Sequence, residues 1–70
     1  MKFQRIEDMR IDSDLTQEEV ARILGCNRNV YSRYERSVYD IPVWALIRLS
    51  LHYKVSTDYL LGLTNRPERG

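Results

Sequence analysis

Cysteine is almost absent from this chain, since Cys26 is the single one among 70 residues. One cysteine cannot form an internal disulfide, and no group of cysteine and histidine residues has the spacing of a metal site. This usage is typical of a reducing compartment. No apolar run approaches the roughly 20 residues of a membrane helix, and the charged first ten residues do not form a signal peptide. We therefore expect a soluble, cytoplasmic protein with no bound metal and no membrane contact.

Catalytic groupings are missing as well. The sequence contains no Ser–His–Asp set, no arrangement of paired carboxylates and no glycine-rich phosphate loop. His52 lies near the end of a predicted helix, where a cation is favourable, so we interpret it as structural. Cys26 is expected to pack in the core, with redox sensing as the alternative. The sequence thus predicts no catalytic residue, no cofactor, no small-molecule substrate and no enzyme.

What the chain does have is a recurring set of helix signals. No stretch alternates apolar and polar residues as a strand does, and 70 residues make one domain. We predict a compact all-α domain of five helices over residues 1–66, followed by a short flexible tail over 67–70. Fraying is expected from Thr64 onward. The predicted helices cover residues 2–11, 16–24, 28–36, 42–53 and 57–61.

Particular residues mark the ends of these helices. Thr16 and Glu19 have the spacing of a capping box, in which each side chain accepts a hydrogen bond from the backbone N–H of the other. Gly25 follows the last apolar position of the second helix and permits the left-handed conformation that closes a helix. The remaining signals are N-caps at Asn27 and Ser56 and a first-turn proline at Pro42.

Apolar residues at helical spacing predict the core. The fourth helix carries a second stripe, formed by Trp44, Arg48 and Leu51, that we place away from the core. For Trp44 three roles stay open: packing on the tail, donation of its N–H to a phosphate, or contact with a partner protein. The predicted core comprises Phe3, Ile6, Met9, Val20, Ala21, Ile23, Leu24, Val30, Tyr31, Tyr34, Val43, Leu46, Ile47, Ser50, Tyr59, Leu60 and Leu61.

Positive charge is concentrated in the third predicted helix although the whole chain has a net charge of only +1. Residues 1–25 carry four basic and six acidic side chains, whereas residues 26–37 carry three arginines against one glutamate. Arginine presents a planar fork of donors that fits both phosphate and the edge of guanine. The distribution favours nucleic acid as a partner of this segment.

The second and third helices have the spacing of a helix-turn-helix, because only a short turn containing Gly25 separates them. Ala21 is small enough for the close approach of the two helices. One face of the third helix then points away from the core, and it carries Arg28, Asn29, Ser32, Arg33 and Arg36.

That face has the side chains that read a DNA major groove. Arginine bonds guanine O6 and N7 together, and asparagine bonds adenine N6 and N7 together. Arg28 and Asn29 lie at the helix N-terminus, which is the end that approaches base edges in this motif. Arg33 lies further along and reaches either bases or phosphate. The N-termini of the second and fourth helices, near Gln17 and Trp44, offer backbone N–H groups that suit phosphates.

These motifs resemble a known family. Residues 15–25 (LTQEEVARILG) resemble the second-helix signature of the phage-repressor, or Cro/C1-type, helix-turn-helix family, also called the XRE family. Residues 31–36 (YSRYER) resemble the end of its recognition helix, residues 41–42 (IP) its entry to the fourth helix, and residues 55–62 (VSTDYLLG) its closing helix. The resemblance covers roughly residues 3–65 and implies the lambda-repressor-like fold.

The resemblance also implies a function: transcriptional regulation, most often repression, by homodimers on near-palindromic double-stranded DNA operators. It implies a structural ion pair between Arg10 and Glu35, and it implies that Gln17 contacts phosphate and braces the first recognition residue. It assigns base reading to Arg28, Asn29 and Arg33, and the dimer interface to the closing helix with Val55, Tyr59 and Leu63. The residues expected to position the DNA backbone are Gln17, Arg22, Asn27, Ser32, Arg36 and Trp44.

Three positions depart from the family pattern. Ser37 stands where glycine is common, so we expect a less regular exit from the third helix. Tyr31 replaces a branched aliphatic residue, and its hydroxyl needs a partner or the surface. Lys54 stands where glycine or asparagine often closes the fourth helix. None of these departures removes an expected DNA contact.

A second class of function stays open beside DNA binding. The chain would then be a helical protein-interaction module, such as an antitoxin or an adaptor, with DNA binding secondary to a regulatory protein partner. Exposed Arg28, Asn29 and Arg33 favour the first class, whereas an exposed and unpaired Trp44 favours the second.

Overall fold

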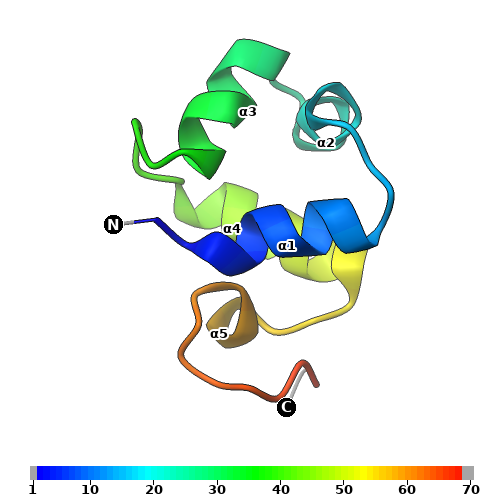
Figure 1. Cartoon of the computed structure of the whole chain (residues 1–70), viewed down its shortest axis with the longest axis vertical. Coiled ribbons are helices and arrows are strands. Elements are labelled where there is room, and N and C mark those ends of the chain that lie inside the picture. Colours follow the sequence, from blue (N-terminus) through cyan, green and yellow to red (C-terminus); the bar gives the residue numbers. More distant parts are fainter. Residues whose placement is uncertain (1, 69–70) are drawn as a thin grey trace.

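The computed structural model describes residues 2–68 and contains five α-helices (Figure 1): α1 (Gln4–Asp12), α2 (Gln17–Leu24), α3 (Arg28–Glu35), α4 (Val43–Tyr53) and α5 (Thr57–Leu60). This confirms the predicted all-α fold and the order of its helices. The molecule measures 31 × 23 × 20 Å, with α3 and α2 at one end of the long axis and α5 at the other. Among the residues described, no helix has the length and apolar character needed to cross a bilayer.

The predicted caps form as expected. Thr16 Oγ1 accepts a hydrogen bond from the Glu19 N–H (3.1 Å), and the Glu19 carboxylate accepts one from the Thr16 N–H (3.0 Å), which completes the capping box. Asn27 Oδ1 accepts from the Val30 N–H (2.9 Å) at the start of α3. Such caps each stabilise a helix by about 1 kcal/mol, because they satisfy N–H groups that have no partner within the helix.

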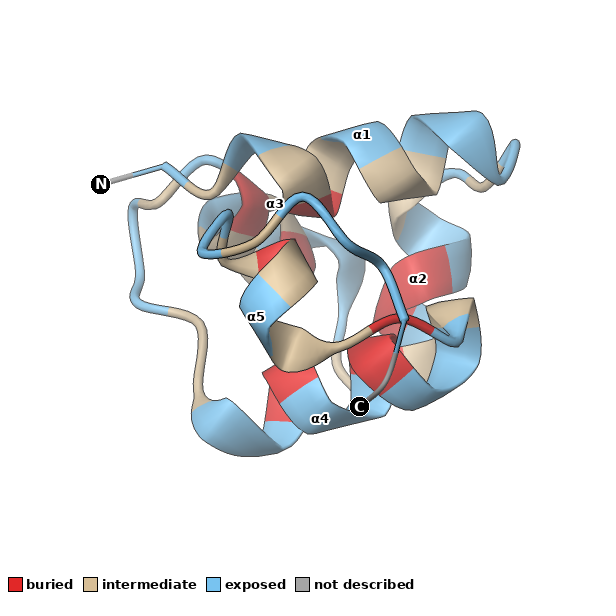
Figure 2. Cartoon of the chain, turned by 90° about the horizontal axis from the view of Figure 1, so that it is seen from below, coloured by how far each residue is buried: buried red, intermediate tan, exposed pale blue. Residues whose placement is uncertain are grey.

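A core of ten apolar residues lies between the helices. Tyr31 and Leu49 are both fully buried near its centre, and Figure 2 shows the buried segments turned toward the interior while the outer helix faces are exposed. Burial of each such side chain stabilises the fold by about 1.5–3 kcal/mol. The ten residues are Ile6, Val20, Ala21, Leu24, Tyr31, Ala45, Leu46, Leu49, Val55 and Leu60.

Helix α4 buries a different face from the one predicted. Val43 and Ile47 were expected in the core but are 70% and 47% exposed, whereas Ala45 and Leu49 are fully buried. Apolar residues lie on both sides of this helix, so helical spacing alone did not distinguish the buried side. Leu46 and Ser50 lie within both the predicted and the observed face, which is rotated toward Ala45 and Leu49.

Two departures from the family pattern coincide with left-handed backbone. Ser37, just after α3, has φ 61°, and Lys54, which closes α4, has φ 59°. Both positions therefore require the conformation that glycine adopts without steric cost, and side chains there cost about 1–2 kcal/mol. The left-handed backbone at positions 37 and 54 explains why glycine is common there in the family pattern.

The segment after α5 is attached to the domain, which corrects the expectation of fraying from Thr64. Arg5 Nη1 donates to the carbonyl oxygens of Tyr59 (3.0 Å) and Thr64 (2.6 Å), and its guanidinium lies 4.2 Å from the Tyr59 ring centre. The Ser56 N–H donates to the Pro67 carbonyl oxygen (3.0 Å). The chain is thus held as far as Pro67, which belonged to the predicted tail; residues 69 and 70 of that tail lie outside the described residues.

Candidate nucleic-acid interface

The α2–turn–α3 unit is built on a three-residue turn. Gly25 takes the left-handed conformation (φ 77°), and the Cys26 N–H donates back to the Ala21 carbonyl oxygen (2.9 Å). Ala21 is 1% exposed where the helices meet, as its small size predicted. Cys26 is half-buried against the core, and burial raises the pKa of its thiol. A thiol with a raised pKa is poorly reactive, so the packing interpretation of Cys26 fits better than redox sensing.

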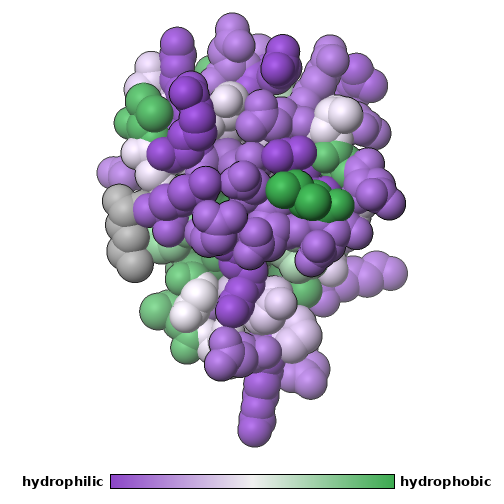
Figure 3. All heavy atoms as spheres, viewed as in Figure 1, coloured by the Kyte–Doolittle hydropathy of each residue, from purple (hydrophilic) through white to green (hydrophobic). Residues whose placement is uncertain are grey.

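Helix α3 lies at one end of the long axis of the molecule (Figure 1). Arg28, Asn29, Arg33 and Arg36 are all exposed, and Ser32 is half-buried. In Figure 3 the surface at this end of the molecule is mostly hydrophilic. The predicted base-reading residues therefore lie together on one uncovered side of α3.

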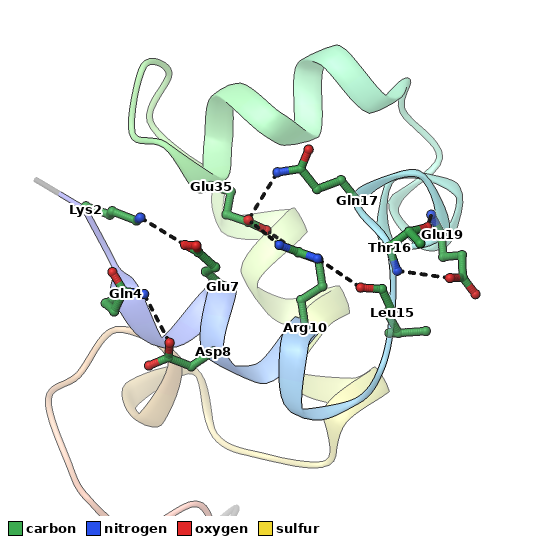
Figure 4. A network of polar contacts seen from close by, with 10 residues as sticks. All are labelled: Lys2, Gln4, Glu7, Asp8, Arg10, Leu15, Thr16, Gln17, Glu19 and Glu35. Carbon is green, nitrogen blue, oxygen red and sulfur yellow. Dashed lines mark hydrogen bonds and ion pairs between the residues drawn. The ribbon is translucent and has the colours of Figure 1, made fainter.

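A polar network fastens the other side of α3 to α1 and α2 (Figure 4). Arg10 approaches the Glu35 carboxylate with two donors, Nε to Oε2 (2.9 Å) and Nη2 to Oε1 (3.0 Å). The third guanidinium nitrogen of Arg10, Nη1, donates to the Leu15 carbonyl oxygen (3.0 Å), and Gln17 Nε2 donates to Glu35 Oε1 (3.2 Å). The ion pair implied by the resemblance is present, and together with Gln17 it links α1, α2 and α3 at the C-terminal end of α3.

The network keeps Glu35 ionised although its side chain is only 3% exposed. Burial alone would raise the pKa of Glu35, but the side-chain interactions with Arg10, Tyr31 and Gln17 oppose it and hold the pKa below its ordinary value. The pKa of Arg10 is raised in turn, first by its hydrogen bond to Glu35. Because the single acidic residue of α3 is neutralised internally, the exposed side of this helix carries arginine charge alone.

Gln17, which the resemblance implies contacts phosphate and braces the first recognition residue, has a hydrogen-bond partner at the other end of α3. Its amide nitrogen is directed to Glu35 rather than to solvent, and its side chain is half-buried. It still borders an open hollow between the N-termini of α2 and α3, lined by Arg10, Leu15, Thr16, Gln17, Glu18 and Arg28. Gln17 and Arg28 therefore flank one concave surface, which is where the expected phosphate contact and the first base-reading residue meet.

The other residues expected to position DNA have distinct surroundings. Arg22 is exposed on α2, with Glu18 Oε1 4.0 Å away. Asn27 is exposed but uses Oδ1 as the N-cap of α3. Trp44 is 48% exposed, and its ring centre lies 5.4 Å from the guanidinium carbon of Arg48, so it is not unpaired.

The residues expected at a dimer interface do not form one exposed surface. Val55 is 5% exposed and belongs to the core of its own chain, which corrects its assignment. Tyr59 is half-buried beneath Arg5, whereas Leu63 is 74% exposed. Val55 follows Lys54, the left-handed residue that closes α4, and its N–H donates to the carbonyl oxygen of Ser50 (3.0 Å), which holds it against the buried end of that helix.

Two contacts near the interface were not predicted from the sequence. Arg48 Nη1 donates to the Leu24 carbonyl oxygen (3.0 Å) and thereby caps the C-terminus of α2 from α4. Tyr39, after α3, accepts a hydrogen bond from Arg33 Nη1 (3.3 Å). The first contact joins two different helices, and Tyr39 lies outside α3, so helical spacing could not predict either of them.

A tight turn with a left-handed glycine, two crossing helices and an exposed basic side on the second define a helix-turn-helix domain. The chain belongs to the helix-turn-helix family whose model matches residues 6–60, which confirms the resemblance to Cro/C1-type domains. The family comprises regulatory domains rather than enzymes.

Named relatives agree with this assignment. The chain is 37% identical over 68 residues to the uncharacterized HTH-type transcriptional regulator YobD of Bacillus subtilis, covering 97% of this chain and 61% of YobD. It is 43% identical over 58 residues to the HTH-type transcriptional regulator ImmR of the same species, covering 83% and 46%. It is 35% identical over 51 residues to the cryptic phage CTXphi transcriptional repressor RstR of Vibrio cholerae, covering 73% and 46%. The chain thus spans about half the length of these relatives, and no solved structure is a significant match.

Proposed function

We propose that this chain binds double-stranded DNA in a sequence-specific manner and acts as a transcriptional repressor. The observation that carries the proposal is the uncovered side of α3, on which Arg28, Asn29 and Arg33 are exposed while Glu35 is neutralised by Arg10 on the opposite side. The names of ImmR and RstR, a transcriptional regulator and a transcriptional repressor, support the regulatory role.

In this proposal α3 lies in the major groove and its first turn reads bases. Arg28 recognises guanine through O6 and N7, and Asn29 recognises adenine through N6 and N7, each with a discrimination of about 1–3 kcal/mol. Arg33 lies one and a half turns further along the same helix and reads a neighbouring base pair. Bases are preferred to phosphate for Arg28 and Asn29 because the N-terminal end of the recognition helix approaches the base edges.

The DNA backbone is held by groups around this helix. Gln17 and the start of α2 face one strand across the hollow that Arg28 also borders. Arg36, the C-cap of α3, is exposed and available to the backbone at that end of the helix. The full set proposed for backbone positioning is Gln17, Arg22, Asn27, Ser32, Arg36 and Trp44.

We extend the proposal to a homodimer on a near-palindromic operator. Two recognition helices related by a twofold axis enter successive major grooves when they are about 34 Å apart, one turn of the duplex. Leu63 remains the exposed apolar member of the proposed closing-helix interface. Sedimentation of wild type and Leu63→Glu tests this part: weaker association of the variant supports it, and a concentration-independent monomer on and off DNA contradicts it.

An alternative function, a protein-interaction module, is favoured by one observation. Val43, Trp44, Ile47 and Leu51 form an exposed apolar stripe along α4, with exposed fractions between 47% and 70%. Contiguous apolar surface of this kind marks protein contacts more often than isolated exposed residues do. In this alternative DNA binding is secondary to a partner on α4.

Equilibrium binding to random-sequence duplexes at two salt concentrations separates the two functions. A DNA-binding domain loses affinity with a slope of about −0.9 in log K against log salt for each phosphate neutralised. Selection of preferred duplexes from the same library then gives the operator. Binding that is undetectable, or that does not change with salt, would contradict the DNA-binding proposal and leave the α4 stripe as the functional surface.

A further inference from the structure

Tyr39 contacts one of the proposed base-reading arginines through both its hydroxyl and its ring. Arg33 Nη1 donates to the Tyr39 hydroxyl (3.3 Å), and the guanidinium carbon lies 5.3 Å from the centre of the ring. Both residues are exposed, with Tyr39 at 48%. The contact therefore lies on the surface of the domain beside the recognition helix and takes no part in the core.

The backbone brings Tyr39 to this position. The N–H groups of Val38 (2.9 Å) and Tyr39 (3.2 Å) both donate to the Arg33 carbonyl oxygen, and the left-handed Ser37 between α3 and these residues reverses the chain. Tyr39 is thus anchored by its backbone to the same residue that its side chain contacts. These two hydrogen bonds fix the backbone from which the Tyr39 ring projects. The ring therefore lies beside the Arg33 side chain and restricts its conformations.

We propose that Tyr39 is a positioning residue that orders Arg33 for base reading, an inference that rests on the proposed function. Arginine has five N–H donors, and the tyrosine hydroxyl engages Nη1 alone. The edge formed by Nε and Nη2 stays available for a bidentate contact with guanine. Ordering the side chain before binding reduces the conformational entropy that is lost when the complex forms.

The neutral character of Tyr39 distinguishes this contact from the Arg10–Glu35 pair. A carboxylate at this place would neutralise the guanidinium and weaken its attraction to DNA, as Glu35 neutralises Arg10 in the interior. Among residues 2–68, no ion pair involves Arg33. Tyr39 therefore restricts the orientation of Arg33 while its full positive charge remains exposed.

The test is a double-mutant cycle on the duplex that wild type prefers in a random-library selection. Tyr39→Ala should weaken binding to that duplex about two- to tenfold, the range expected for ordering one long side chain. In an Arg33→Ala background the same substitution should have no further effect. Tyr39→Phe, which keeps the ring, should fall between wild type and Tyr39→Ala, and Val38→Ala is the matched control because it changes an exposed neighbour.

A second readout does not involve DNA. Arginine side-chain NMR relaxation of the free protein should show a more mobile Arg33 guanidinium in Tyr39→Ala than in wild type or Val38→Ala, at an unchanged melting temperature. A merely structural role would change the melting temperature instead.

Three results would overturn the inference: unchanged affinity of Tyr39→Ala, an equal loss in the Arg33→Ala background, or tighter binding, which would show that Tyr39 competes with the base. Failure of the proposed function itself looks different. If the proposed function fails, wild type selects no duplex. If only the inference about Tyr39 fails, wild type still selects a duplex but the double-mutant cycle shows no coupling between Tyr39 and Arg33.

Discussion

The buried ion pair between Arg10 and Glu35 allows a quantitative prediction, because its partners are side by side and nearly inaccessible. The side chain of Glu35 is 3% exposed and that of Arg10 is 16% exposed. Removing one partner leaves the other charge buried without its counterion, which typically costs about 3–5 kcal/mol. We expect this cost for Glu35→Ala and for Arg10→Ala alike.

The loss is large compared with the stability of a domain of this size. At about 0.05–0.15 kcal/mol per residue, 70 residues have a free energy of unfolding of roughly 4–10 kcal/mol. With a shift of about 4–8 °C per kcal/mol for small domains, each single variant should melt at least about 12 °C lower than wild type. The double variant Arg10→Met/Glu35→Leu leaves no unpaired charge, so it should be more stable than either single variant.

The Glu35 carboxylate should also make the free energy of unfolding decrease as the pH falls. The folded-state pKa of Glu35 lies below its ordinary value of 4.5, so the unfolded chain binds more protons in acid than the folded chain does. The stabilisation is fully present above the unfolded pKa and is lost as the pH falls through the folded pKa. Glu35→Gln, which cannot ionise, should lack this part of the acid destabilisation.

Urea denaturation and thermal melting, both followed by circular dichroism at pH 7 and at pH values from 5 downward, measure these quantities. Lys2→Ala is the control, because its bond to Glu7 (3.0 Å) is on the surface, where ion pairs contribute about 0–1 kcal/mol. The reasoning would be refuted if the Arg10 and Glu35 single variants lost less than about 1 kcal/mol, or if their losses added without coupling in the double variant.

Four further predictions follow from backbone geometry and burial. Gly25→Ala should destabilise by about 1 kcal/mol in urea denaturation, because an alanine at φ 77° has a strained backbone. Steric clash adds nothing to this cost, since the atom nearest to the added Cβ would be 3.7 Å away. Lys54→Gly should stabilise by about 0.5–1 kcal/mol by relieving the same strain at φ 59°, and a loss would contradict this. Tyr31→Phe should destabilise by about 1 kcal/mol in urea denaturation, because the buried Tyr31 hydroxyl interacts with the Glu35 carboxylate and helps to hold the pKa of that carboxyl below its ordinary value; an unchanged stability would contradict this. Arg5→Ala should speed amide hydrogen exchange at Ser56, whose N–H is bonded to the attached C-terminal segment, and unchanged exchange would show that Arg5 does not hold this segment.

Much of the fold was predictable because it depends on local signals. The capping box at Thr16, the N-cap at Asn27 and the left-handed Gly25 are each determined by neighbours within a few residues, and all three are present. Helical spacing likewise predicted Ile6 and Leu24 in the core. Local chemistry therefore determined where α2 and α3 begin and where α2 ends.

Features that depend on tertiary contacts were not predictable in the same way. Helix α4 has apolar residues on two sides, and only its packing against the other helices decides that Ala45 and Leu49 are buried while Val43 is exposed. The attachment of residues 64–67 depends on Arg5, almost sixty positions earlier in the chain. Side chains that interact across such separations leave no periodic trace in the sequence.

The candidate site shows the same division. The exposure of Arg28 and Asn29 follows from the position of the turn, which the sequence indicates directly. The orientation of Gln17 toward Glu35 and the contact of Tyr39 with Arg33 depend on side-chain geometry after the chain has folded. The resemblance to a family implied the Arg10–Glu35 pair but carried no information on Tyr39.

The most direct test of the proposed function compares wild type with Arg28→Ala on the selected operator and on duplexes that each differ from it by one base pair. If α3 enters the major groove with Arg28 reading a guanine, the variant should lose about 1–3 kcal/mol of discrimination at one base pair and keep it at the others. Equal weakening on every duplex would contradict base reading by Arg28 and make it a phosphate contact.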